Sequence, residues 1–161
     1  MSRTSRKSLA FPVLFLAAGV LMAQGGAAAK KFTVWPAADL KWQPLAGAPG
    51  PAGAPGPMLA VISGDPTKGA YKAIEKFPAG FSAPMHTHPV THKAVIISGT
   101  WIHGEPGKPD VRLGPGSYLV QPAGMKHTTA CDAASECVFY IESSGKFGIT
   151  LVDEKKSPAK K

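Results

Sequence analysis

The sequence is poor in charged, aromatic and cysteine residues. Of its 161 residues, 17% are charged and 8% are aromatic, and only 2 are cysteines. Because 44% of the residues are hydrophobic and few are charged, the chain is not expected to be disordered in the main. A chain of this length is long enough for one domain whose core needs no covalent cross-links.

The body of the chain also lacks a basic stripe interleaved with aromatic residues. The net charge is +8, but many of the basic residues lie near the two ends of the sequence. Nucleic acid is therefore not an expected partner. No G-x-S-x-G elbow, phosphate-binding loop or carboxylate pair occurs, so the sequence gives no support to a hydrolase or a kinase.

The N-terminal residues have the pattern of a secretory signal peptide. Three basic residues precede an uncharged apolar run over residues 9–22, and Ala27-Ala28-Ala29 then form an A-x-A cleavage site. The run of 14 residues is shorter than the roughly 20 that a membrane-spanning helix needs, with an uncleaved anchor as the alternative. We expect cleavage of residues 1–29 and a periplasmic or secreted mature protein that no longer contacts the membrane.

Export gives the two cysteines a possible structural role. Cys131 and Cys137 flank a polar, turn-like insert between two strand-like runs. In an oxidising compartment they could bridge adjacent strands at a hairpin. Two separately buried thiols are the alternative.

Short strands are predicted throughout. The chain holds 18 glycines and 16 prolines, and turn residues recur between short apolar or alternating runs without helical periodicity. This pattern is typical of an all-β sandwich or barrel. We expect a first strand at 31–35 within an N-terminal region of residues 30–57, which also holds a Gly/Pro-rich loop. A barrel over 58–152 and a charged tail over 153–161 are expected to follow. The barrel strands are expected at 58–62 and 70–77, in a strand that holds His86 and His88 and is interrupted by Pro89, and then at 92–97, 100–103, 111–113, 117–121, 127–131, 137–141 and 147–152.

Four of the five histidines lie next to glycine and proline turns. His86, His88 and His92 fall within seven residues, and His127 follows the turn Pro122-Ala123-Gly124. On a β-strand, His86 and His88 would project from the same face. Imidazoles are good ligands for divalent transition metals, and inward residues of neighbouring barrel strands can converge. The pattern favours one metal site over unrelated core or surface histidines.

These residues resemble the two motifs of the cupin family. Gly80, His86, His88 and Gly99 match the first motif, with His92 where a glutamate is usual. The second motif is matched by Gly116, Pro122, Gly124 and His127, with Cys131 at the position of the usual asparagine. The resemblance covers residues 58–152 and extends to small single-domain bacterial cupins, some of which are similar to the cupin domain of zinc-containing anti-sigma factors. It implies a double-stranded β-helix, the jelly-roll barrel.

Two functions are possible, depending on whether His92 is a metal ligand. Four histidines around a tetrahedral Zn²⁺ would close the site, which suits binding or sensing of a metal or small ligand. If His92 is not a ligand, or if the metal has more ligands, a position stays open for a dioxygenase or isomerase acting on a small organic molecule. We expect one divalent metal, with zinc favoured and iron, manganese, nickel or copper as alternatives. Cys131 as a thiolate ligand and a barrel without metal are less favoured.

Two further expectations concern strand faces. Glu75 alternates with Tyr71 and Phe77 and could line the pocket, but a solvent-facing position is favoured. Val95 and Ile97 are expected to point outward, by parity from His92, and to leave apolar surface uncovered. A homodimer through this surface is therefore expected.

Overall fold

The computed structural model describes residues 32–48 and 55–152. The expected signal peptide at 1–29 and the charged tail at 153–161 lie outside the described residues, as do residues 49–54 of the Gly/Pro-rich loop. The compact unit that contains the barrel begins at Val34.

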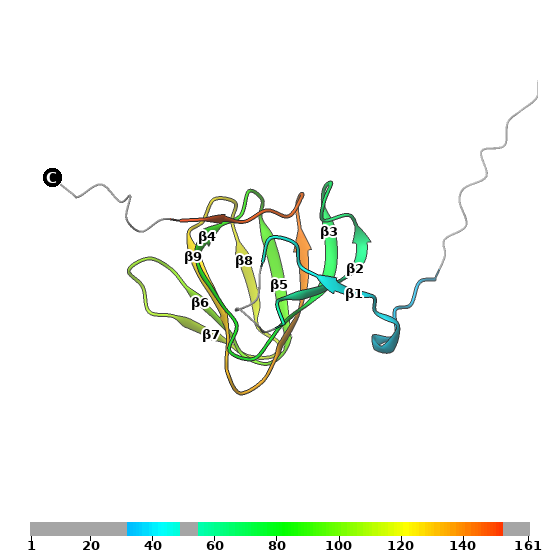
Figure 1. Cartoon of the computed structure of the whole chain (residues 1–161), viewed down its shortest axis with the longest axis horizontal. Coiled ribbons are helices and arrows are strands. Elements are labelled where there is room, and N and C mark those ends of the chain that lie inside the picture. Colours follow the sequence, from blue (N-terminus) through cyan, green and yellow to red (C-terminus); the bar gives the residue numbers. More distant parts are fainter. Residues whose placement is uncertain (1–31, 49–54, 153–161) are drawn as a thin grey trace, which may run out of the picture. The chain divides into compact units, whose positions relative to one another are not determined.

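Short strands dominate this unit, as Figure 1 shows. A single turn of 3-10 helix, Ala37–Asp39, precedes them in the described part of the chain. The strands are β1 (Trp42–Pro44), β2 (Met58–Gly64), β3 (Tyr71–Phe77), β4 (Ser82–Thr87), β5 (His92–Ser98), β6 (Trp101–Gly104), β7 (Val111–Leu113), β8 (Tyr118–Gln121), β9 (His127–Cys131), β10 (Cys137–Ser143) and β11 (Thr150–Leu151).

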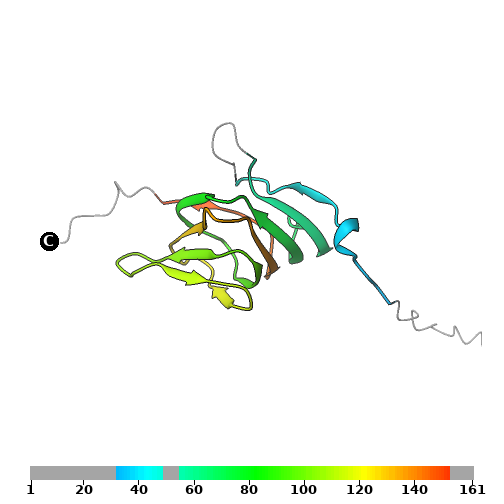
Figure 2. The ribbon, with the colours of Figure 1, turned by 90° about the horizontal axis from the view of Figure 1, so that it is seen from below.

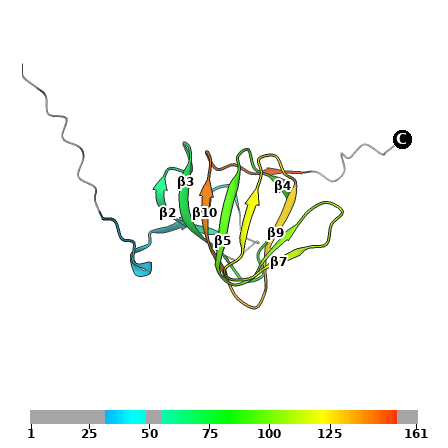
Figure 3. The ribbon, with the colours of Figure 1, turned by 180° about the vertical axis from the view of Figure 1, so that it is seen from behind.

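Two antiparallel sheets face each other. One has the order β1-β2-β3-β10-β5-β8 and the other the order β11-β4-β9-β6-β7. From β3 onward the chain passes repeatedly from one sheet to the other, because β4, β6, β7, β9 and β11 belong to the second sheet. Figure 3 shows β2, β3, β10 and β5 side by side, and Figure 2 shows the layers from below. This arrangement confirms the predicted all-β jelly roll.

The interior changes character along the strands. At one end, the aromatic end, Phe77, Phe81, Trp101 and Phe139 pack together with ring centroids 4.5 to 5.4 Å apart. At the other end, the histidine end, His92 is paired in register with Ser143, which in turn is paired with Tyr71. The inward face of β3 joins the two ends, since its buried residues alternate from Tyr71 to Phe77.

A disulfide bond links the two sheets at the aromatic end. Cys131 ends β9, Cys137 begins β10, and their Cα atoms are 5.8 Å apart. The predicted disulfide is therefore present, but the predicted hairpin is wrong, because β9 and β10 belong to different sheets and do not pair with each other. The disulfide also rules out Cys131 as a thiolate ligand in this structure, because its sulfur is bonded to Cys137.

Gly99, the last glycine of the first motif, is required by the turn between β5 and β6. Its φ is +76°, a region that residues with side chains rarely adopt. A Cβ atom there would lie 2.8 Å from the Cα of Cys137 and closer still to the carbonyl oxygen of Glu136. The glycine therefore allows this turn to approach the backbone at Cys137 closely.

The strand predicted at 31–35 is wrong. The described residues 32–35 are not part of a strand, and the first strand is β1, at Trp42–Pro44. Phe32, Val34 and Trp35 are exposed, so no neighbouring strand or core stabilises an extended pairing there. The last strand is also shorter than expected, because only Thr150–Leu151 pairs with β4.

The outer face of β5 and β8 carries exposed apolar side chains. Val95 and Ile97 are 38% and 50% exposed, which confirms their predicted outward orientation. Val95 pairs with Tyr118 of β8, which is 59% exposed, and Val120 lies on the same strand. Among the described residues, no helix has the length and apolarity needed to cross a membrane.

Candidate metal centre

Three histidines gather at the histidine end. His86 of β4 and His127 of β9 are paired across neighbouring strands, and their ring centroids are 4.2 Å apart. His88 lies one residue beyond β4, with its ring centroid 4.9 Å from that of His86. One ring nitrogen from each of the three lies within 4.8 Å of the others. The two cupin motifs therefore meet in one cluster, as the sequence predicted.

Backbone geometry brings these side chains together. The pairing of β4 with β9 shifts register between Ala83 and His86, and regular pairing resumes at His86 opposite His127. Such an irregularity changes the direction of a strand and of the side chains that follow it. Pro89 then follows His88 and cannot donate a backbone hydrogen bond to continue the strand.

Hydrogen bonds fix one tautomer in each of the three rings. The Nδ1 atom of His86 lies 2.7 Å from the carbonyl oxygen of Pro84, and that of His88 lies 2.7 Å from the carbonyl oxygen of Gly148. The Nδ1 atom of His127 lies 2.9 Å from the carbonyl oxygen of Met125. Because a carbonyl oxygen only accepts, each Nδ1–H must donate, which leaves the Nε2 lone pair available. This is the usual arrangement of metal-binding histidines.

Burial keeps these imidazoles neutral. Desolvation lowers the pKa of His86 and of His88, and it lowers the pKa of His127 to about 4. A metal binds the neutral ring, so no proton has to be displaced at neutral pH. The Nε2 atom of His127 is buried without a hydrogen-bond partner among the described residues. An unpaired buried nitrogen is costly, and a metal ion would satisfy it. The three residues therefore fit a divalent metal.

His92 lies beside this cluster rather than within it. Its ring centroid is 4.4 Å from that of His88, but the residue does not belong to the three-histidine group. Its Nε2 atom is buried and unpaired, and its ring stacks on Phe147 at 6.2 Å. Burial lowers its pKa to about 3, with neighbouring histidines adding to the effect. Its role as a fourth ligand stays a prediction.

His103 is a further neighbour that the sequence did not single out. It lies on β6 and is half-buried, with its ring stacked on that of His127 at a centroid distance of 5.5 Å. It is not a member of the three-histidine group. The sequence offered little signal for this position, because β6 is short and His103 belongs to neither cupin motif.

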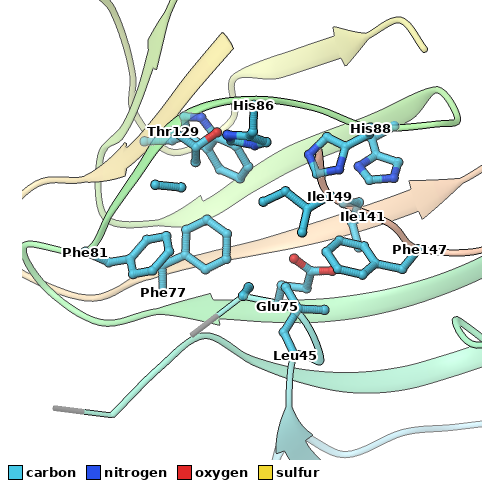
Figure 4. Close-up of a pocket in the computed structure, with 14 residues that line it drawn as sticks. Leu45, Glu75, Phe77, Phe81, His86, His88, Thr129, Ile141, Phe147 and Ile149 are labelled. Carbon is cyan, nitrogen blue, oxygen red and sulfur yellow. The ribbon is translucent and has the colours of Figure 1, made fainter. Parts of the chain in front are cut away.

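A pocket begins at the histidines and continues toward the aromatic end. Its unfilled space is about 420 Å³, a value that includes space open to solvent. Figure 4 shows His86 and His88 on one side, with Phe77, Ile141, Phe147 and Ile149 around the space. A small organic ligand would therefore contact the metal through one part and apolar side chains through the rest.

Glu75 is the residue that the sequence placed wrongly. The expectation was a solvent-facing side chain, but Glu75 is only 2% exposed and lines the same pocket as the histidines. Its Oε1 atom has no hydrogen-bond partner among the described residues, and burial raises its pKa to about 8. The alternation with Tyr71 and Phe77 was the available signal, since both neighbours are buried on the inward face of β3.

The jelly roll that brings these histidines into one cluster is a cupin-like fold. Three solved structures have a similar fold, each at low sequence identity. The polyketide cyclase RemF from Streptomyces resistomycificus has a TM-score of 0.64 and 15% identity, over 80% of this chain and 90% of that chain. The dimethylsulfoniopropionate (DMSP) lyase DddQ from Ruegeria pomeroyi DSS-3 has a TM-score of 0.57 and 22% identity, over 71% and 62% of the two chains. A cupin-like protein from Thermotoga maritima has a TM-score of 0.50 and 18% identity, over 64% and 83%.

Sequence comparison gives the family. The chain belongs to the family defined by the domain of unknown function DUF4437, whose model matches residues 28–155. A shorter stretch of 52 residues is 38% identical to the dimethylsulfoniopropionate lyase DddQ of Ruegeria pomeroyi. That stretch covers 32% of this chain and 26% of DddQ, so the chain matches about a quarter of the curated relative.

Proposed function

We propose that this protein is a metal-dependent enzyme that acts on a small organic molecule. The observation that carries the proposal is a three-histidine group, two members of which line an apolar pocket that also holds a buried carboxyl group. A site that only stored or sensed a metal would need neither the pocket nor Glu75. The names of two similar proteins, a lyase and a cyclase, favour a reaction on a carbon skeleton.

The residues of the site would have different roles, according to their positions. His86, His88 and His127 would hold the ion, and the backbone carbonyls that accept from their Nδ1–H groups would keep the rings oriented. A bound divalent ion would polarise a substrate oxygen or activate a water molecule. The apolar lining would exclude water from the rest of the ligand. We favour zinc, with iron, manganese, nickel and copper as alternatives, because imidazoles do not select one of these metals alone.

Cobalt substitution tests whether the site has an open position. Protein loaded with Co²⁺ should change its visible absorption spectrum when azide is added, because azide would enter the coordination shell. His127→Ala should lose the bound metal, whereas His103→Gln, an altered histidine outside the three-histidine group, should keep it. A cobalt spectrum that azide leaves unchanged would contradict the enzyme proposal.

The second candidate is a binding or sensing protein with a closed four-histidine site. The proximity of His92 to His88 supports it, as does the resemblance to the cupin domain of zinc-containing anti-sigma factors. His92→Ala separates the two candidates. In the closed site the variant should bind metal more weakly and become responsive to azide. In the enzyme, His92→Ala should retain metal with nearly unchanged affinity.

We also propose that the protein is exported and forms a homodimer. The N-terminal pattern of residues 1–29 and the disulfide between Cys131 and Cys137 support export, since disulfides persist in oxidising compartments. Apolar exposure on β5 and β8 supports the dimer. N-terminal sequencing of the mature protein should start at Lys30. Light scattering should give the mass of a dimer that Ile97→Lys converts to a monomer.

A further inference from the structure

We propose that Glu75 is a ligand-binding residue, and that the pocket takes a small linear molecule with a polar group at each end. One end would be a carboxylate or similar oxygen group bound at the histidines. The other would be a hydroxyl or carbonyl group that hydrogen-bonds the carboxyl group of Glu75. This inference rests on the proposed metal site and adds a substrate class to it.

The position of Glu75 supports the second contact. His92, Ser143 and Tyr71 lie in one row across the sheet, and Glu75 follows Tyr71 by four residues along β3. At about 3.3 Å per residue, the row of Glu75 lies about 13 Å further along the strand. Glu75 itself pairs in register with Phe139 of the aromatic end. Glu75 and the histidines line the same pocket from different strands, so one ligand would contact both.

The surroundings of Glu75 explain why a ligand would be linear and mostly apolar. Figure 4 shows Glu75 across the pocket from His86 and His88, with Ile141, Phe147 and Ile149 between them. Among the described residues, the only ionisable side chains that line this pocket are Glu75 and the histidines. The middle of a ligand would therefore contact only apolar groups, and a polar group there would lose its hydrogen bonds to water.

A purely structural role does not account for Glu75. A buried carboxyl group normally forms hydrogen bonds within the protein, because leaving it unpaired costs free energy. Oε1 of Glu75 has no partner among the described residues. The burial that raises the pKa of Glu75 to about 8 leaves a neutral carboxyl group at pH 7. A neutral carboxyl group can both donate and accept a hydrogen bond.

Matched pairs of fatty acids test this inference. The probes are the linear alkanoates from propanoate to hexanoate and their ω-hydroxy derivatives, titrated calorimetrically into the metal-loaded protein. At one chain length the hydroxy acid should bind about tenfold more tightly than the plain acid, the effect of one hydrogen bond in a dry pocket. Glu75→Leu should abolish this gain, and Glu75→Gln should keep part of it. Glu142→Gln, on the exposed face of β10, is the matched control and should leave the gain unchanged.

The outcomes separate this inference from the proposed metal site. If the metal-loaded protein shows no gain at any chain length, or the same gain in Glu75→Leu, the role of Glu75 is wrong while the metal site stands. If the purified protein binds no metal, and Co²⁺ or Zn²⁺ cannot be loaded, the proposed function is wrong and the two-ended ligand is wrong with it. Metal content, measured on every variant, tells these cases apart.

Discussion

The aromatic end and the histidine end lie in one barrel but differ in their interior side chains, which are apolar at one end and polar at the other. At the aromatic end, Phe77, Trp101 and Phe139 fill the space between the sheets, and the disulfide links the two sheets beside them. At the histidine end, the residues on the equivalent inward face are imidazoles, and the Nε2 atoms of His92 and His127 have no hydrogen-bond partner among the described residues. In the described part of the chain, the aromatic end has one buried nitrogen without a partner, Nε1 of Trp101, whereas at the histidine end two unpaired imidazole nitrogens lie among clustered rings.

This difference shows how a small barrel combines stability with a site. Burying unpaired imidazoles costs free energy, so the aromatic end must supply enough apolar burial for the fold to tolerate the histidine end. Glu75 lies between the two, on the inward face of β3, and is the one acidic residue of the pocket that joins them. Changes at the aromatic end should therefore act with or without metal, and changes at the histidine end should depend on metal.

Truncation at the aromatic end should have the largest effect. Phe139 is fully buried and packs against Phe77 and Trp101 at centroid distances of 4.9 and 4.5 Å. Phe139→Ala should lower the free energy of unfolding by about 3–5 kcal/mol, because apolar burial is lost and a cavity remains. Urea unfolding should give the same loss with and without metal. The exposed control Glu142→Ala should change stability by less than about 0.5 kcal/mol. A loss that appeared only with metal present would contradict the separation of the two ends.

Bound metal should raise the free energy of unfolding by an amount similar to the loss in Phe139→Ala, but only when the histidines are intact. Zn²⁺ at about a thousand times its dissociation constant should add about 4 kcal/mol to the free energy of unfolding, because it binds the folded state. The gain should disappear in His127→Ala, since the Nε2 atom that points to the cluster is removed. Thermal unfolding with added Zn²⁺ or with a chelator measures both values. Equal stabilisation of the wild type and the variant would show that the metal binds elsewhere.

Much of the fold could be predicted from the sequence because the strands are short and clearly bounded. Residues 127–131 lie between two turn-like segments, and β9 begins and ends at these residues. The histidine cluster was predictable because both motifs fix the spacing between their glycines and histidines. The strand at 31–35 was not, because apolar residues form a strand only where a partner exists, and the partner of β2 is β1, at Trp42–Pro44.

Glu75 shows why the site could be predicted only in part. Its place in the alternation was visible, but a glutamate on an inward face is rare enough that solvent exposure is the better expectation. Which face of β3 points inward is decided by pairing with β2 and β10 on either side, and neither contact is local in sequence. Whether His92 is a ligand could not be predicted either, because the orientation of one side chain decides whether it would contact a bound metal.

Loss of the disulfide should have a smaller effect, confined to the aromatic end. Opening the short loop between Cys131 and Cys137 should cost about 2 kcal/mol, on the chain-entropy model of a loop of this size. Cys131→Ala/Cys137→Ala should show this loss in urea unfolding while metal content stays unchanged. Loss of metal from the double variant at a temperature where it remains folded would show that the two ends are coupled through β9.

The smallest effect should come from the carboxyl group that lies between the ends. The pKa of Glu75 is raised from 4.5 to about 8, so in this range the folded protein holds a proton that the unfolded chain has released. Stability should then fall as the pH rises, by about 1.4 kcal/mol per pH unit, until the pH passes the folded pKa. Near pH 7 the unfolded histidines still hold part of their protons while the folded ones are neutral, so their contribution to the slope opposes that of Glu75. The difference in slope between the metal-free wild type and Glu75→Gln, measured by urea unfolding with a chelator, isolates the carboxyl group. If the two slopes are equal, Glu75 is ionised within the pocket at neutral pH.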